Sequence, residues 1–111
     1  MTTDNLPSVA VPAAVREYSF VYILLCSDGV FYVGRAKDVG RRIRQHVSGR
    51  GAKFTRDHAL PRLVYFEGPM SQAEAVQREA QLKRWSRAKK EALIRRDTGL
   101  LKSLTQSRGF Q

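Results

Sequence analysis

The chain has 111 residues, of which 42% are apolar, 20 are Lys or Arg and 10 are Asp or Glu. This length fits one compact domain and excludes two separate cores, and the apolar share excludes an unfolded tail. A formal net charge of +10 and an isoelectric point near 10.5 favour a polyanionic partner, nucleic acid first, over a charge excess that serves solubility alone.

The N-terminal part of the chain divides into a leader and a hairpin. Residues 1–15 have no periodic pattern and predict a flexible leader, with one domain following over residues 16–98. Bulky residues over 18–25 and again over 30–33, separated by the turn residues Ser27, Asp28 and Gly29, predict a β-hairpin. Alternation in its first strand places four side chains on one face, namely Tyr18, Phe20, Tyr22 and Leu24.

A short basic helix and a third strand are expected next. Asp38 is a suitable N-cap, and apolar residues at spacing four, Val39, Ile43 and Val47, form a stripe on a helix that runs through residue 48. Residues 52–58 have the pattern of a further helical turn. The β-type run 63–66, closed by Gly68 and Pro69, predicts the third strand.

Two helices follow. Ser71 and Glu74 form a capping box, in which each side chain satisfies a free backbone N–H at the start of a helix running to about Trp85. Ser86 begins a second helix that extends to about residue 97 with Gly99 as its stop, and residues 99–111 form a tail whose state the pattern leaves open. The expected fold is α/β in the α+β sense: a small three-stranded, antiparallel-containing sheet in the order β-β-α-β-α-α, with helices packed on the sheet.

The compartment follows by elimination. Cys26 is the single cysteine, which excludes an internal disulfide and fits a reducing environment. The apolar stretch 9–15 is short, contains Pro12 and has no basic region before it, so it fits neither a signal peptide nor a membrane span. We therefore expect a cytoplasmic protein that does not associate with membranes.

The hairpin and the helices carry a recognisable set of motifs. Phe20-Val21-Tyr22-Ile23 is followed by Tyr32-Val33-Gly34-Arg35, then by a helix with Arg41, Arg42 and His46, and later by the helical run 74–83. In this order the motifs resemble the GIY-YIG nuclease superfamily over about residues 18–93. The segment 49–56 and the strand after Pro61 are similar to the small stand-alone bacterial branch and to the eukaryotic structure-specific endonuclease catalytic subunit.

The resemblance implies an active site and a cofactor. It places Tyr22 and Tyr32 in the active site, lets Gly34 bring the strand end close, adds Arg42 and His46 from the helix, and makes Glu79 the ligand of Mg²⁺ or Mn²⁺. Phosphodiester hydrolysis needs a base for the attacking water, a cation beside the phosphoryl oxygens and help for the leaving oxygen. Tyr22, relayed through His46 or Tyr32, is the expected base, with its pKa lowered by nearby positive charge.

Helix geometry agrees with two of these assignments. Arg42 and His46 are four positions apart, so both lie on one face of the helix beside the apolar stripe; a solvated basic face is the structural alternative. Glu79 falls within an apolar arc of its helix, where an unpaired carboxylate is costly. Its alternative is an ordinary ion pair with Lys83 at spacing four.

The remaining cations suggest how nucleic acid is held. Backbone contacts by basic side chains give affinity without sequence choice, and an aromatic ring can stack on an exposed base. The expected nucleic-acid-binding residues are Arg35, Lys37, Arg41, Arg44, Arg50, Lys53, Phe54 and Arg56. A second basic cluster surrounds Trp85, which we interpret as a packing anchor.

These features predict a metal-dependent endonuclease that cuts single-stranded or branched DNA in repair, recombination or processing. Many family nucleases carry an Asn late in the domain, whereas Asn5 is the single Asn in this chain. Two alternatives therefore stay open. The first is a nucleic-acid-binding module with the nuclease fold and weak activity. The second is a catalytic subunit that depends on a partner protein.

Overall fold

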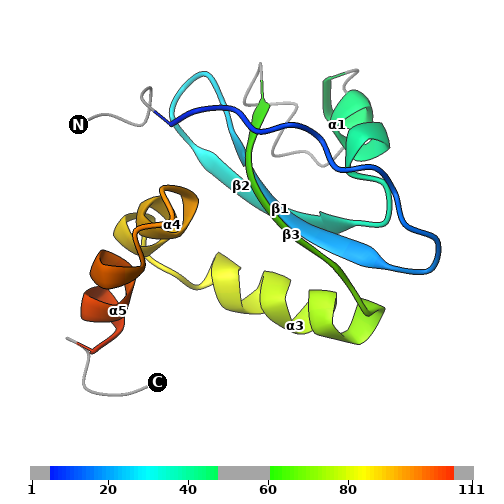
Figure 1. Ribbon diagram of the computed structural model, residues 1–111. Coiled ribbons are helices and arrows are strands. Elements are labelled where there is room, and N and C mark those ends of the chain that lie inside the picture. Colours follow the sequence, from blue (N-terminus) through cyan, green and yellow to red (C-terminus); the bar gives the residue numbers. More distant parts are fainter. Residues whose placement is uncertain (1–5, 48–60, 107–111) are drawn as a thin grey trace.

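The computed structural model describes residues 6–47 and 61–106. The expected α+β architecture is confirmed: strands and helices follow one another in the anticipated order around one small sheet, and a further helix, α5, follows and packs on α4 (Figure 1). The expected turn at 52–58 lies outside the described residues. The elements are β1 (Ser19–Leu25), β2 (Phe31–Ala36), α1 (Val39–Val47), β3 (Arg62–Met70), α3 (Gln72–Lys83), α4 (Arg87–Ile94) and α5 (Thr98–Gln106).

The sheet is fully antiparallel, with the strand order β2-β1-β3. The strand β1 is central because it pairs with β2 on one edge and β3 on the other, and all seven of its residues are buried because both faces of the sheet are covered. The turn after β1 follows the predicted chemistry, since Gly29 has a φ of 84° and the Asp28 side chain accepts a hydrogen bond from the Val30 N–H at 3.2 Å. The strand β3 is longer than expected and pairs as far as Met70 with Ser19.

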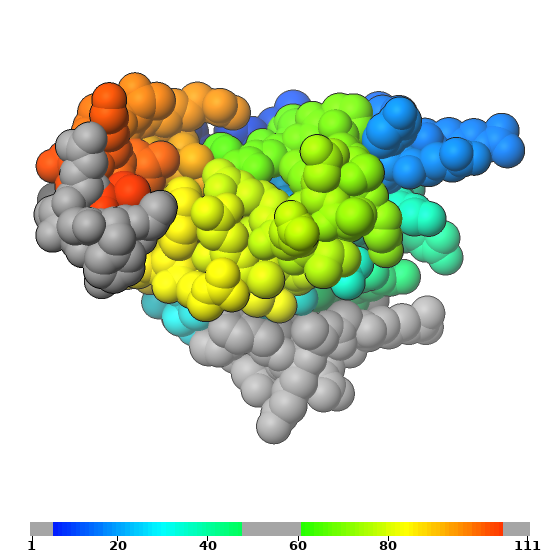
Figure 2. Space-filling view, turned by 90° about the horizontal axis from the view of Figure 1, so that it is seen from below, coloured from blue at the N-terminus to red at the C-terminus, as the bar shows by residue number. Residues whose placement is uncertain are grey.

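Alternation along β1 divides the interior into two clusters. Phe20, Tyr22 and Leu24 face Val39 of α1. The intervening residues of β1 face α3 and α4, where Ala75 and Leu82 are buried. Figure 2 shows α3 lying across this second face of the molecule. The sheet is therefore covered on opposite faces by α1 and by α3 with α4.

Two side chains depart from the expected pattern. Tyr18 precedes β1 and is 48% exposed, so it does not share the face of Phe20 and Tyr22. Val47 ends α1 and is 66% exposed, so the buried part of the stripe consists of Val39 with Ile43 packed beside it.

The N-terminal segment differs from the expected leader. Leu6 is 1% exposed and belongs to the cluster beneath α3 and α4, and Val9 packs in the cluster beside α1. The Val9 N–H donates to the Leu63 carbonyl at 3.0 Å, and Ser8 accepts from Arg62 at 2.9 Å. Residues 6–9 therefore cover the outer edge of β3, and the packed chain begins before Arg16. The physical reason for this packing is that β3 is an edge strand, and its outer N–H and C=O groups would otherwise be unpaired.

The helix caps confirm most of the predicted boundaries. Asp38 accepts from the Arg41 N–H at 3.0 Å, and Ser71 and Glu74 form the complete capping box at the start of α3. The C-terminal boundary was predicted wrongly, because α4 ends at Ile94 and Gly99 lies inside α5. Arg96 adopts a φ of 57°, and Asp97 accepts from the Leu100 N–H at 3.0 Å and so caps the new helix.

Candidate active site

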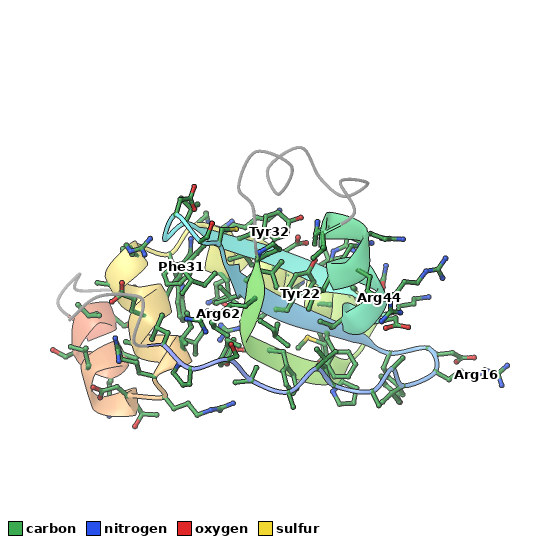
Figure 3. All side chains as sticks on the ribbon, turned by 90° about the horizontal axis from the view of Figure 1, so that it is seen from above. Arg16, Tyr22, Phe31, Tyr32, Arg44 and Arg62 are labelled. Atoms are coloured by element: carbon green, nitrogen blue, oxygen red, sulfur yellow. The ribbon has the colours of Figure 1, made fainter. Side chains whose placement is uncertain are left out.

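Tyr22 and Tyr32 meet around a glycine. Tyr22 of β1 stands opposite Gly34 of β2, so both point to the α1 face of the sheet. A Cβ on Gly34 would lie 2.6 Å from the Tyr22 hydroxyl oxygen and 3.0 Å from a ring carbon of Tyr32. The two phenol rings are 6.3 Å apart between centroids (Figure 3). Glycine is therefore needed at position 34 for close approach of the two phenols, and not for an unusual backbone angle.

His46 brings α1 to the same point. The cap at Asp38 sets where α1 begins, and two turns later the imidazole turns inward and is 2% exposed. Its Nε2 atom is 3.3 Å from the Tyr22 hydroxyl oxygen, and its ring lies edge-on to Tyr32 at 5.1 Å between centroids. A solvated position for His46 is thereby excluded.

Burial and the charge of Arg42 have opposite effects on the pKa of the Tyr22 hydroxyl. Burial, then the neighbouring Tyr32, raises the pKa of Tyr22 well above its usual value, although the charge of Arg42 and its hydrogen bond lower it. The expectation that positive charge lowers the pKa of Tyr22 overall is therefore wrong, because the hydroxyl is fully buried. The pKa of His46 is lowered by burial and by the charge of Arg42, so the imidazole is neutral at pH 7.

Glu79 approaches from the other face of the sheet. Its side chain is 18% exposed, and its negative charge is one of the smaller causes that raise the pKa of Tyr22. It is not the unpaired carboxylate that its position on the helix suggested. Oε1 accepts from Arg35 Nε at 2.9 Å, and Oε2 is 3.2 Å from Lys83 Nζ. The spacing-four pair with Lys83 therefore exists together with a longer-range pair to β2.

Glu79 is the carboxylate that could hold a divalent metal at this site. Among the described residues there is no group of three or more His, Cys, Asp or Glu side chains that could enclose an ion. Mg²⁺ does not need one, because it commonly keeps several waters and binds through one or two carboxylates and substrate phosphates. Glu79 is partly exposed and fits this open type of site, provided that its cationic partners Arg35 and Lys83 move aside.

The expected nucleic-acid-binding residues divide into three groups. Lys37 and Arg41 line a hollow of about 290 Å³ between the end of β2 and α1, together with Arg42, and Arg44 is exposed on the same helix. Arg35 contacts Glu79. The others lie outside the described residues, namely Arg50, Lys53, Phe54 and Arg56.

Sequence reasoning missed two contributors. Gln45 lines the hollow beside Arg42, and no pattern in the chain distinguishes it. Arg78, adjacent to Glu79, donates to both oxygens of Glu67 on β3 at 2.8 and 2.7 Å. This bidentate pair fixes the rotation of α3 and hence the direction of Glu79. A cation and a carboxylate eleven positions apart carry no helical signal, so the pair could not have been found from the sequence.

The family assignment follows from comparison with known proteins. The model of the GIY-YIG catalytic domain matches residues 18–92, and the chain belongs to this family, which is a family of nucleases. A nuclease domain implies a nucleic acid substrate. Within residues 6–47 and 61–106, no helix combines the length and apolar character needed to cross a bilayer.

Two similar proteins carry the name UPF0213. A UPF0213 protein of Haloquadratum walsbyi is 40% identical over 86 residues, covering 78% of this chain and 97% of its own length. One from Staphylococcus aureus strain N315 is 46% identical over 76 residues, with coverages of 68% and 93%.

Two solution NMR structures are similar. A protein of E. faecalis is 31% identical with a TM-score of 0.55, covering 78% of this chain and 92% of its own. A UPF0213 protein of Bacillus halodurans is 43% identical with a TM-score of 0.47, covering 79% and 94%.

Proposed function

We propose that this protein is a cytoplasmic, divalent-metal-dependent endonuclease that hydrolyses phosphodiester bonds in single-stranded or branched DNA, in repair, recombination or processing. One observation carries the proposal. Tyr22, Tyr32 and His46 converge around Gly34 on one face of the sheet, and Glu79 contacts Arg35, the residue after Gly34, from the other face. Side chains from β1, β2 and α1 thus meet at Gly34, and α3 contributes Glu79 through its contact with the next residue of β2.

The substrate phosphate would enter from the α1 side. Lys37, Arg41 and Arg42 line the hollow there, and Asp38 is the one acidic side chain among its lining residues. The three cations outnumber this one carboxylate, so the hollow has a net positive charge. An anion of phosphate size is the ligand that such a hollow attracts. Arg42 interacts with the Tyr22 hydroxyl and is the cation best placed to stabilise charge on the phosphoryl oxygens.

Proton transfer would run from water through Tyr22 to His46. A free tyrosinate is unfavourable because burial raises the pKa of Tyr22. Tyr22 is fully buried in the free protein, so the substrate would have to bring water to the hydroxyl; a neutral imidazole 3.3 Å away can then accept the phenol proton while the phenol takes one from that water, and Tyr22 need not ionise by itself. Tyr32 packs edge-on against His46 and holds the imidazole in place.

A metal held by Glu79 would offset negative charge on the phosphate and the leaving oxygen. Arg78 and Glu67 keep that carboxylate on the side of α3 that faces β2.

The test is cleavage of labelled single-stranded, duplex and branched DNA with Mg²⁺, with Mn²⁺ and with EDTA. Metal-dependent cutting by the wild type, lost in both Glu79→Ala and Arg42→Ala, supports the proposal. Glu91→Ala is the matched control for Glu79, since Glu91 is also a helical, partly exposed carboxylate in a spacing-four ion pair. Arg16→Ala, at a 95% exposed side chain, is the control for Arg42. Equal cutting by all variants would place the chemistry elsewhere or in a contaminant.

A binding module with weak or partner-dependent activity is the second candidate. Both oxygens of Glu79 are engaged by cations, and the pKa of Tyr22 is raised, which are features of a site that is not ready for catalysis. In that case DNA binding would survive Glu79→Ala and no cutting would appear with any metal. Cutting that appears only after addition of a cell extract would indicate the required partner protein.

A further inference from the structure

Both oxygens of the candidate metal ligand are occupied by the protein's own cations. Oε1 of Glu79 accepts from Arg35 at 2.9 Å, and Oε2 is 3.2 Å from the Lys83 ammonium. The carboxylate side chain is 18% exposed, so water screens these two contacts only in part. A divalent ion that binds an oxygen at about 2.1 Å would lie beside two positive charges. At least one of the two cations must therefore move before a metal can bind well.

Of the two cations, Arg35 is the one better suited to leave Glu79 and bind a substrate phosphate. Lys83 is one turn away on the same helix, is 56% exposed, and forms the kind of pair that contributes little. Arg35 extends from β2 across to α3 and directly follows Gly34, around which the two phenols meet. Its guanidinium matches a phosphate in geometry as well as in charge, and can donate two parallel hydrogen bonds to it.

On the basis of the proposed function, we propose that the Arg35–Glu79 ion pair makes metal binding depend on nucleic acid. Without nucleic acid, Arg35 occupies Glu79 and the metal binds weakly. When a phosphate reaches the site, Arg35 transfers to it and the Glu79 carboxylate becomes free for the metal. Because such coupling is reciprocal, the metal also strengthens nucleic acid binding by the same factor. Arg35 is in this view a positioning residue that selects for phosphate before the metal is loaded.

The direct test measures Mn²⁺ binding to the full-length protein without nucleic acid. The concentration of unbound Mn²⁺ is followed by electron paramagnetic resonance. Arg35→Gln and Arg35→Met should bind Mn²⁺ at least about threefold more tightly than the wild type, because one competing charge is gone. Arg87→Gln is the matched control, since it removes an arginine that contacts Glu91 and not Glu79. Circular dichroism establishes that each variant is folded before titration.

A second titration adds a phosphorothioate dT oligonucleotide of twelve residues as the probe. The oligonucleotide should raise the Mn²⁺ affinity of the wild type by a larger factor than that of Arg35→Gln. Equal factors in the two proteins, or unchanged Mn²⁺ affinity of both Arg35 variants relative to Arg87→Gln, would overturn the inference and leave the nuclease proposal standing. Undiminished Mn²⁺ binding by Glu79→Gln would instead overturn the assignment of Glu79 as the metal ligand, on which both depend.

Discussion

Replacing Gly34 by alanine tests whether the close approach of β2 to the Tyr22 hydroxyl builds the site. The new Cβ would meet the hydroxyl oxygen at 2.6 Å, whereas ordinary contact begins near 3.4 Å, so the phenol or the strand must shift by about 0.8 Å. Tyr22 is fully buried and faces His46, which leaves no open space for that shift. Overpacking of this kind costs about 1–3 kcal/mol of unfolding free energy.

Gly40→Ala in α1 is the matched control. There the new Cβ would lie 3.3 Å from a methyl carbon of Val11 and 3.5 Å from the Arg44 side chain, both far ends of side chains. Alanine also has the higher helix propensity, so Gly40→Ala should be neutral or stabilise by up to about 1 kcal/mol.

The assay is urea unfolding of both variants, followed by DNA cleavage at a temperature where both remain folded. Gly34→Ala should lose stability and, because the phenol is displaced from His46, should lose most of its activity as well. The reasoning is refuted if Gly34→Ala unfolds at the same urea concentration as Gly40→Ala and cuts DNA equally well.

Four further outcomes are expected. Tyr22→Phe should remain folded and abolish cleavage, because the hydroxyl that contacts His46 is gone; cleavage at the wild-type rate would contradict the relay. Since the pKa of His46 is lowered, its neutral form should persist below pH 6.5, and activity measured against pH should decline only at more acidic values. The stability that neutral His46 contributes is complete above pH 6.5 and decreases below it. Glu67→Gln should destabilise the fold by about 1–3 kcal/mol in thermal or urea unfolding, because Arg78 loses a bidentate partner. Burial alone would raise the pKa of Glu67, but hydrogen bonds from Arg78 and Tyr65 hold that pKa below its usual value. The stability from this pair is therefore present above about pH 4.5 and is lost as the pH falls. DNA binding measured by fluorescence anisotropy in EDTA should weaken steeply with salt, and Arg41→Gln should reduce the slope of the logarithm of affinity against the logarithm of salt by about 0.7–0.9, whereas an unchanged slope would remove Arg41 from the phosphate contacts.

The secondary-structure elements of this protein are determined largely by local sequence. The bulky runs on either side of Ser27, Asp28 and Gly29 can form only a hairpin, because the turn residues admit the required backbone angles and the flanking residues need burial. Ser71 and Glu74 lie three positions apart, and this spacing alone fixes where α3 begins. The helix stop near Gly99 failed for a local reason too, since Asp97 caps a new helix and the left-handed position belongs to Arg96.

The candidate site needed both kinds of information. The sequence could name Tyr22, Tyr32, Arg42, His46 and Glu79 from their spacing and their resemblance to a family, because helix and strand periodicity place side chains on faces. It could not determine which faces meet. Only the tertiary structure decided that Gly34 lies against the Tyr22 hydroxyl and that burial outweighs Arg42 in setting the pKa of Tyr22. It also decided that Glu79 forms an ion pair with Arg35. Those outcomes depend on contacts between residues 12 to 44 positions apart, and the desolvation of a buried group has no local signature in the chain.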